Sequence, residues 1–128
     1  MTRFKTKNFN SSFKNARKGM RLVLKSERNI RLHMIIAVIV LFMAILFGFK
    51  PNEMCILLLT IGFVIVTEML NTAIEFSLDA IFKNRFSTMV GMAKDISAGA
   101  VMVASIISVA VGLLLFGQAF VRAFSYHL

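Results

Sequence analysis

The chain has 128 residues, of which 58% are hydrophobic and 16% are charged, and its mean hydropathy is +0.78. A single small domain buries too little of its surface to hide so many apolar residues, so a water-soluble globular protein is excluded in favour of a membrane protein. Lys and Arg number 15 against 6 Asp and Glu, giving a net charge of +9, and ten of the basic residues precede Met34. Basic residues gathered beside apolar segments are typical of contact with anionic lipid, so the charge does not indicate nucleic-acid binding.

The first predicted element is the basic segment of residues 1–33. Between Ser11 and His33 the apolar residues recur with helical spacing, and most of the basic residues fall on the other face. This pattern predicts an amphipathic helix that lies on the cytoplasmic surface of the membrane. A solvated basic tail is the alternative interpretation of the same segment.

Three apolar runs follow, and each predicts a transmembrane helix: residues 34–50, 54–79 and 96–121. Pro51 indicates a turn between the first two, because proline cannot continue a helix. The basic residues are divided thirteen to two between the two sides of these spans, which puts the N-terminus and the second connection in the cytoplasm. The sequence therefore predicts an all-α membrane protein that forms one domain over residues 1–128.

Half of the acidic residues lie in one apolar stretch, TEMLNTAIEFSLDAIF, at the end of the second span. Glu68, Asn71, Glu75 and Asp79 are separated by three, four and four residues, which places them within an arc of roughly 80° on one helical face. Placing an acid at the centre of a bilayer costs roughly 2.5–3.5 kcal/mol, so these acids are expected near the cytoplasmic end of the span. Acids kept in a membrane helix at such a cost indicate a functional site there. Pairing with the nearby basic residues is the alternative interpretation.

Other polar residues reach the same level of the membrane, namely Glu27 before the first span and Lys94 and Asp95 before the third. Mg²⁺ binds one or two carboxylates together with phosphates and water, and a lysine suits nucleotide phosphates. The chain has neither a GxxxxGK[ST] loop nor a glycine-rich fingerprint, which excludes the common nucleotide-binding folds. A phosphate site would be assembled here from helix ends, because phosphoryl transfer mainly requires positioning and charge neutralisation.

Three stretches, ERNIRLH, EMLNTAIEFSLD and AKDISAGAV, resemble the bacterial integral-membrane diacylglycerol kinase family, and the resemblance covers nearly the whole chain. It implies a homotrimer in the bacterial cytoplasmic membrane, with active sites between neighbouring subunits that use Mg²⁺ and ATP. By position, it implies that Glu68 is the catalytic base and that Glu27 and Glu75 hold the metal. The residues that correspond to substrate- or nucleotide-binding positions are Asn71, Lys94, Asp79 and Asp95.

The chain departs from the proteobacterial members at His33, where they carry an acid, and is similar there to the Gram-positive branch, whose members often act on undecaprenol. The sequence thus predicts an ATP-dependent lipid kinase acting on undecaprenol, with diacylglycerol as the alternative substrate. His33 itself is interpreted as an interfacial polar residue. Two other classes stay open: a small proton-coupled transporter with a glutamate in the membrane, and a non-catalytic membrane assembly subunit.

Overall fold

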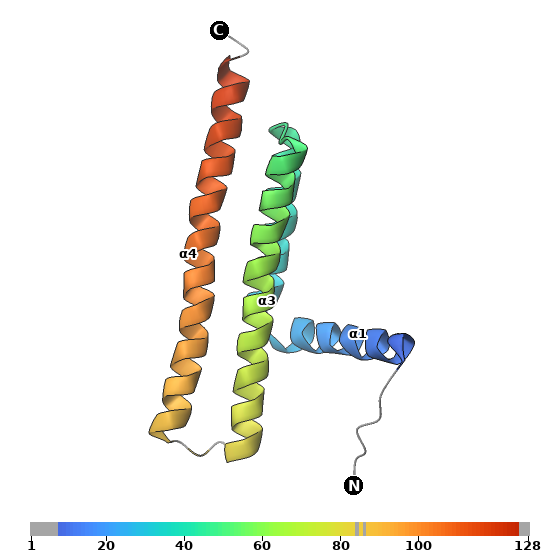
Figure 1. Cartoon of the computed structure of the whole chain (residues 1–128), viewed down its shortest axis with the longest axis vertical. Coiled ribbons are helices and arrows are strands. Elements are labelled where there is room, and N and C mark those ends of the chain that lie inside the picture. Colours follow the sequence, from blue (N-terminus) through green and yellow to red (C-terminus); the bar gives the residue numbers. More distant parts are fainter. Residues whose placement is uncertain (1–7, 84, 86, 126–128) are drawn as a thin grey trace.

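The computed structural model describes residues 8–83, 85 and 87–125, and all the regular structure in this part of the chain is helical. The four helices are α1 (Phe9–Ser26), α2 (Arg28–Leu46), α3 (Pro51–Phe82) and α4 (Thr88–Ser125). Helix α3 packs against both α2 and α4, while α1 extends to the side of these three long helices (Figure 1). The predicted all-α fold with three spans is confirmed, because α2, α3 and α4 are each long and apolar enough to cross a membrane.

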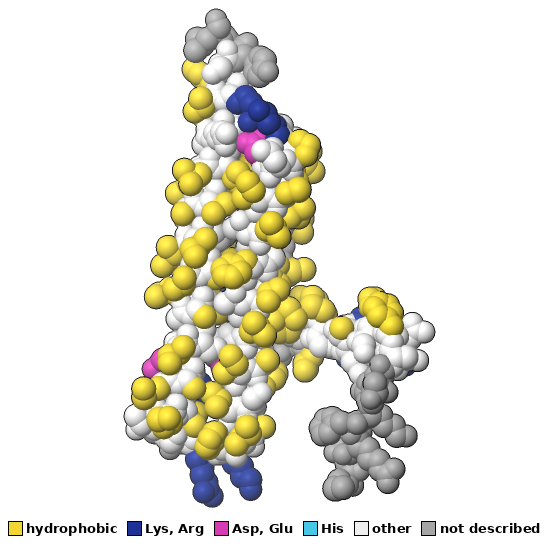
Figure 2. Space-filling model, in the orientation of Figure 1, with side chains coloured by type: hydrophobic (Ala, Val, Ile, Leu, Met, Phe, Trp, Pro, Cys, Tyr) yellow, Lys and Arg dark blue, Asp and Glu magenta, His cyan; other side chains and the backbone are white. Residues whose placement is uncertain are grey.

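Large apolar side chains cover the exterior of the three long helices, and Lys and Arg side chains gather toward the ends (Figure 2). The buried core is correspondingly small, and one cluster consists of Ala44, Leu57 and Leu115. Leu59 and Leu114 are 75% and 74% exposed. Apolar surface on this scale is stable when hydrocarbon surrounds it, so the chain is a membrane protein.

Helices α3 and α4 are longer than a bilayer requires. Their 32 and 38 residues extend about 48 and 57 Å at 1.5 Å per residue, against roughly 30 Å of hydrocarbon. Both helices run past the predicted limits of their spans at both ends, because polar residues continue the helix on either side of the apolar run. Helix α2 begins before its predicted span but ends at Leu46, short of the predicted limit at residue 50, because the chain already turns at Gly48. The membrane limits at 34–50, 54–79 and 96–121, the homotrimer and the placement of α1 on a membrane surface stay predictions. Residues 1–7 of that predicted surface segment lie outside the described part.

Two short turns set the order of the helices. Between α1 and α2 a single extended residue, Glu27, changes the chain direction, and the Arg31 side chain donates hydrogen bonds to the carbonyls of Leu24 and Lys25 at 2.9 and 2.8 Å. These bonds satisfy two carbonyls that the end of α1 leaves without helical partners. Between α2 and α3 the chain turns at Gly48, which has a φ of 70°. Pro51 then begins α3, a position where its fixed φ suits the helix and its missing N–H is not needed.

A buried ion pair closes the end of the bundle where α2 turns into α3. Glu53 is 3% exposed, and its carboxylate accepts bonds from the Lys50 backbone N–H at 2.8 Å and from Arg122 of α4 at 2.8 and 3.2 Å. The same guanidinium donates to the Gly48 carbonyl at 3.1 Å. We refer to Gly48, Glu53 and Arg122 as the polar clamp, because these contacts tie the α2–α3 turn to the end of α4.

The polar clamp predicts that Arg122→Met destabilises the fold. The substitution leaves the Glu53 carboxylate buried without its two-pronged partner, and an uncompensated buried charge is strongly destabilising. The midpoint of thermal unfolding in detergent should fall by several degrees. Glu53→Gln added to Arg122→Met should recover part of the loss, because the unpaired charge is then gone.

Lys50→Met is the matched control, since it removes a charge from the same turn. The Lys50 side chain is exposed, and the backbone N–H that bonds Glu53 is retained. Its midpoint should stay near that of the unmodified protein. An Arg122→Met variant that is as stable as Lys50→Met would contradict the role of the clamp.

Candidate active site

Glu68 is the most deeply buried residue of the acidic face of α3. It is 6% exposed, and its carboxylate oxygen Oε1 lies 3.4 Å from Nε2 of His33 on α2. The contact is a few tenths of an ångström longer than an ordinary N–H···O hydrogen bond. The innermost acid therefore faces a titratable side chain of the neighbouring helix.

Asn71 links the acidic face to α4. Its Oδ1 accepts a hydrogen bond of 2.6 Å from the hydroxyl of Ser97, which is 8% exposed, and its amide nitrogen lies 3.5 Å from Oε1 of Glu75. An amide whose oxygen is held by a hydroxyl must direct its N–H₂ group elsewhere, and here that group is directed at Glu75. The two contacts form a chain from α4 through Asn71 to the Glu75 carboxylate.

Asp79 pairs with Lys94 of α4 at 2.6 Å, and these side chains are 40% and 37% exposed. The pair borders a cavity of about 300 Å³ whose lining also includes Arg85, Gly91 and Asp95. For Asp79 the structure thus agrees with the alternative interpretation, in which acids pair with nearby basic residues. Lys94 is held by a carboxylate, so a nucleotide phosphate would bind an ammonium group whose position is already set.

Glu27 lies at the junction of α1 and α2 and is partly buried. Within the described residues of one chain, no three His, Cys, Asp or Glu side chains gather closely enough to hold a metal ion. A single chain therefore does not bring Glu27 and Glu75 together in such a group. The assignment of these two carboxylates to a metal stays a prediction.

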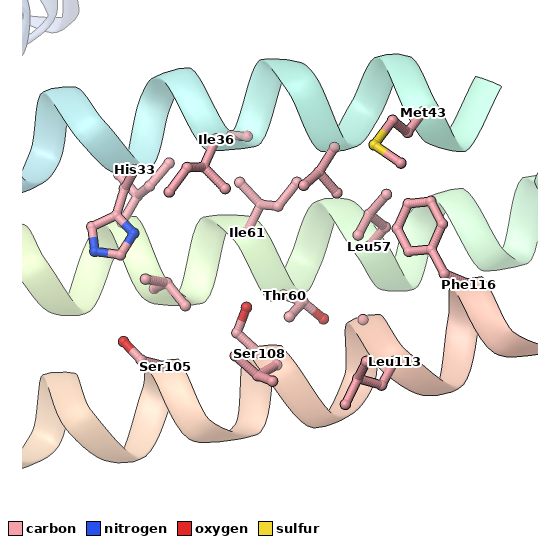
Figure 3. Close-up of a pocket in the computed structure, with 16 residues that line it drawn as sticks. His33, Ile36, Met43, Leu57, Thr60, Ile61, Ser105, Ser108, Leu113 and Phe116 are labelled. Atoms are coloured by element: carbon pink, nitrogen blue, oxygen red, sulfur yellow. The ribbon is translucent and has the colours of Figure 1, made fainter. Parts of the chain in front are cut away.

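An apolar cavity of about 520 Å³ lies between α2, α3 and α4 and ends beside the acidic face. In Figure 3, His33 lies at one end of the labelled side chains, and Met43 and Phe116 lie at the other. The polar groups in the lining are His33 and the hydroxyls of Thr60, Ser105 and Ser108. The Thr60 hydroxyl already donates to the carbonyl of Ile56 at 2.7 Å. The cavity therefore offers a hydrocarbon surface that leads to a polar end.

Two residues of this arrangement were not assigned to it by the sequence. Ser97 lies three positions after Lys94, which places both on one face of α4, and this spacing could have identified it. His33 was interpreted as an interfacial polar residue, but the structure sets it against Glu68. The position of His33 at the start of the first apolar run predicted its depth in the membrane. The sequence did not predict that His33 lies on the side of α2 that faces α3, because that depends on helix packing.

Comparisons with known proteins agree on one family. The profile of the prokaryotic diacylglycerol kinase family matches residues 14–116. Undecaprenol kinase of Bacillus subtilis (strain 168) is 38% identical over 108 residues, which cover 84% of this chain and 87% of that protein. Diacylglycerol kinase of Synechocystis sp. (strain ATCC 27184 / PCC 6803 / Kazusa) is 35% identical over 101 residues, which cover 79% of this chain and 58% of that protein.

Proposed function

The chain belongs to the prokaryotic diacylglycerol kinase family, and on this premise we propose that it transfers the terminal phosphoryl group of ATP to the hydroxyl of undecaprenol. The family makes the chain a lipid kinase, which argues against both the proton-coupled transporter and the non-catalytic subunit. The Bacillus subtilis relative supports undecaprenol as the substrate. Diacylglycerol is the second candidate, and the Synechocystis relative favours it.

The observation that carries the proposal is the apolar cavity that ends beside Glu68. A lipid whose tail occupies this cavity would present its head group to the His33 and Glu68 side chains. Undecaprenol is hydrocarbon up to its hydroxyl, whereas diacylglycerol carries ester groups next to its hydroxyl that lose hydrogen bonds to water on entry. A lining with few polar groups therefore favours undecaprenol.

Phosphoryl transfer requires a base for the alcohol and a positioned donor. In the proposed reaction the alcohol oxygen attacks the γ-phosphorus, the bond from that phosphorus to the bridging oxygen breaks, and Glu68 takes the hydroxyl proton. Asn71 of α3 would orient Glu75 through its amide nitrogen, and the Ser97 hydroxyl of α4 holds Asn71 in turn. Lys94, positioned by Asp79, supplies positive charge to the phosphates, and Asp95 borders the same cavity.

Magnesium fits the carboxylates available, because it takes oxygen ligands from one or two carboxylates and shares the rest with phosphates and water. Glu27 and Glu75 would hold it. When bound, the ion supplies charge neutralisation to the phosphates. The residues of the chain then orient the nucleotide and accept the proton.

We also infer a homotrimer in the bacterial cytoplasmic membrane, with the N-terminus and the α3–α4 connection in the cytoplasm. Among the described residues of one chain no group of three metal-ligating side chains forms, and a site shared between neighbours would supply Glu27 from one subunit and Glu68 and Glu75 from the next. The charge asymmetry of thirteen basic residues to two supports the orientation. ATP would then meet the acidic face from the cytoplasm.

The first prediction from the proposed function concerns the substrate. Purified protein supplied with radiolabelled ATP and Mg²⁺ should phosphorylate undecaprenol with a kcat/KM at least about tenfold above that for diacylglycerol. Glu68→Gln, which keeps the size of the side chain and removes the base, should lower kcat about 10²- to 10⁴-fold. Phosphorylation of diacylglycerol alone would overturn the substrate, and phosphorylation of neither lipid alcohol would overturn the function.

A second prediction concerns shared sites. Glu68→Ala and Glu27→Ala subunits are each expected to be inactive alone. Co-folded at equal amounts, they should recover about a quarter of the unmodified activity, the share of neighbour pairs in which both carboxylates are intact. Mixing Glu68→Ala with Glu68→Gln is the control, since no site there regains its base. A mixture as inactive as its parts would place each site within one subunit.

A third prediction tests the chain of contacts through Asn71. Ser97→Ala removes the hydroxyl that orients the amide, so Glu75 should lose its directed N–H₂ partner and the KM for Mg-ATP should rise about three- to tenfold. Ser77→Ala is the matched control, because that exposed hydroxyl donates only to the Ala73 carbonyl of its own helix. Equal KM values for the two variants would be evidence against the positioning of Glu75 by Asn71.

A further inference from the structure

The proton that Glu68 removes from the alcohol needs a route to water. The Glu68 side chain is 7% exposed, whereas that of His33 is 29% exposed, and the two lie 3.4 Å apart. We propose that His33 accepts this proton from Glu68 and releases it to water, so that the two residues form a proton relay. The inference rests on the proposed function, because it supposes that Glu68 acts as the base.

The position of His33 suits this role. It lines the end of the apolar cavity (Figure 3). Its Nε2 also lies 3.4 Å from the Glu68 carboxylate. Catalytic hydrogen bonds are often long without substrate and shorten when it binds, and a closure of a few tenths of an ångström brings Nε2 within bonding distance of Oε1. Imidazole is also the side chain that exchanges protons with water near neutral pH.

The contacts of several other charged groups at this end of the described structure lie elsewhere. Arg31 donates to the backbone of α1, Lys94 pairs with Asp79, and Glu75 lies against Asn71. Among the residues described, His33 is the basic side chain within 4 Å of Glu68. The contacts therefore single out the imidazole as the first group to which Glu68 can pass a proton.

The relay balances. As the alcohol oxygen bonds to the γ-phosphorus and ADP leaves with the electron pair of the broken bond, the hydroxyl proton moves to Glu68. Nε2 of neutral His33 then takes the proton from the carboxylic acid and becomes imidazolium. The imidazolium releases a proton to water, which restores both side chains and leaves one proton in solution for each lipid phosphorylated.

The test is chemical rescue. His33→Ala should lower kcat about a hundredfold with little change in the KM for undecaprenol, and imidazole added to the buffer should restore much of the rate. Substituted imidazoles of the same size should restore it in the order of their basicity, a dependence that a packing role does not produce. Glu68→Gln should gain nothing from imidazole.

Two further variants separate relay from packing. His33→Gln keeps the bulk and hydrogen bonding of the side chain but cannot carry a proton, so its kcat should be as low as that of His33→Ala. Ile36→Ala enlarges the same cavity one turn along α2, and it should raise the KM for undecaprenol without any response to imidazole.

A His33→Gln enzyme with the unmodified kcat, or a His33→Ala enzyme that imidazole does not restore, would overturn the relay. In either case the unmodified protein would still phosphorylate lipid. If the unmodified protein phosphorylates no lipid alcohol, the proposed function fails, whatever the His33 variants do. The two failures are therefore distinguishable.

Discussion

A carboxylate enclosed by apolar helices needs a polar neighbour, and this requirement on Glu68 determines how α3 is rotated in the bundle. With Glu68 turned to His33 of α2, the residues three, seven and eleven positions further along α3 share nearly the same face. Asn71 and Asp79 consequently meet Ser97 and Lys94 of α4. Glu68, at the inner end of the acidic face, is thus buried between helices instead of facing lipid, where an ionised group would have no partner.

Polar pairs also set how far α3 and α4 slide along one another. Apolar helix surfaces in lipid give little preference for one register, because hydrocarbon outside is as apolar as the partner helix. Three contacts occur in matching order along the two antiparallel helices. Along α3 they involve Glu53, Asn71 and Asp79, and along α4 the partners are met in reverse, as Arg122, Ser97 and Lys94. The polar clamp at one end therefore helps to hold the site at the other end in register.

The sequence predicted those features of the structure that depend on the spacing of residues within one helix or on the distribution of charged residues. The spacing of Glu68 and its neighbours predicted one helical face, and the apolar runs predicted three spans, because both follow from geometry within a single helix. The partners of that face could not be predicted, since which sides of two helices meet depends on packing that no local period encodes. Lys94 shows this limit: its charge suggested a phosphate contact, which stays a prediction, whereas its pairing with Asp79 depends on how α3 and α4 pack. Pro51 correctly indicated a turn between the first two spans, but α2 already ends at Leu46 and Pro51 is the first residue of α3.

The spacing of the acidic face constrains how ATP could lie on it. Glu75 and Asp79 follow Glu68 by seven and eleven residues, about 10 and 16 Å along the helix axis, and exposure rises from 7% for the Glu68 side chain to 40% for that of Asp79. A γ-phosphate must approach the alcohol beside Glu68 to react. If the nucleotide lies along this face, its phosphates pass Glu75 and its nucleoside lies toward the more exposed end. The Lys94–Asp79 pair is then too far along the helix to neutralise the transferred group, and its charge would act toward the nucleoside end of the phosphate chain.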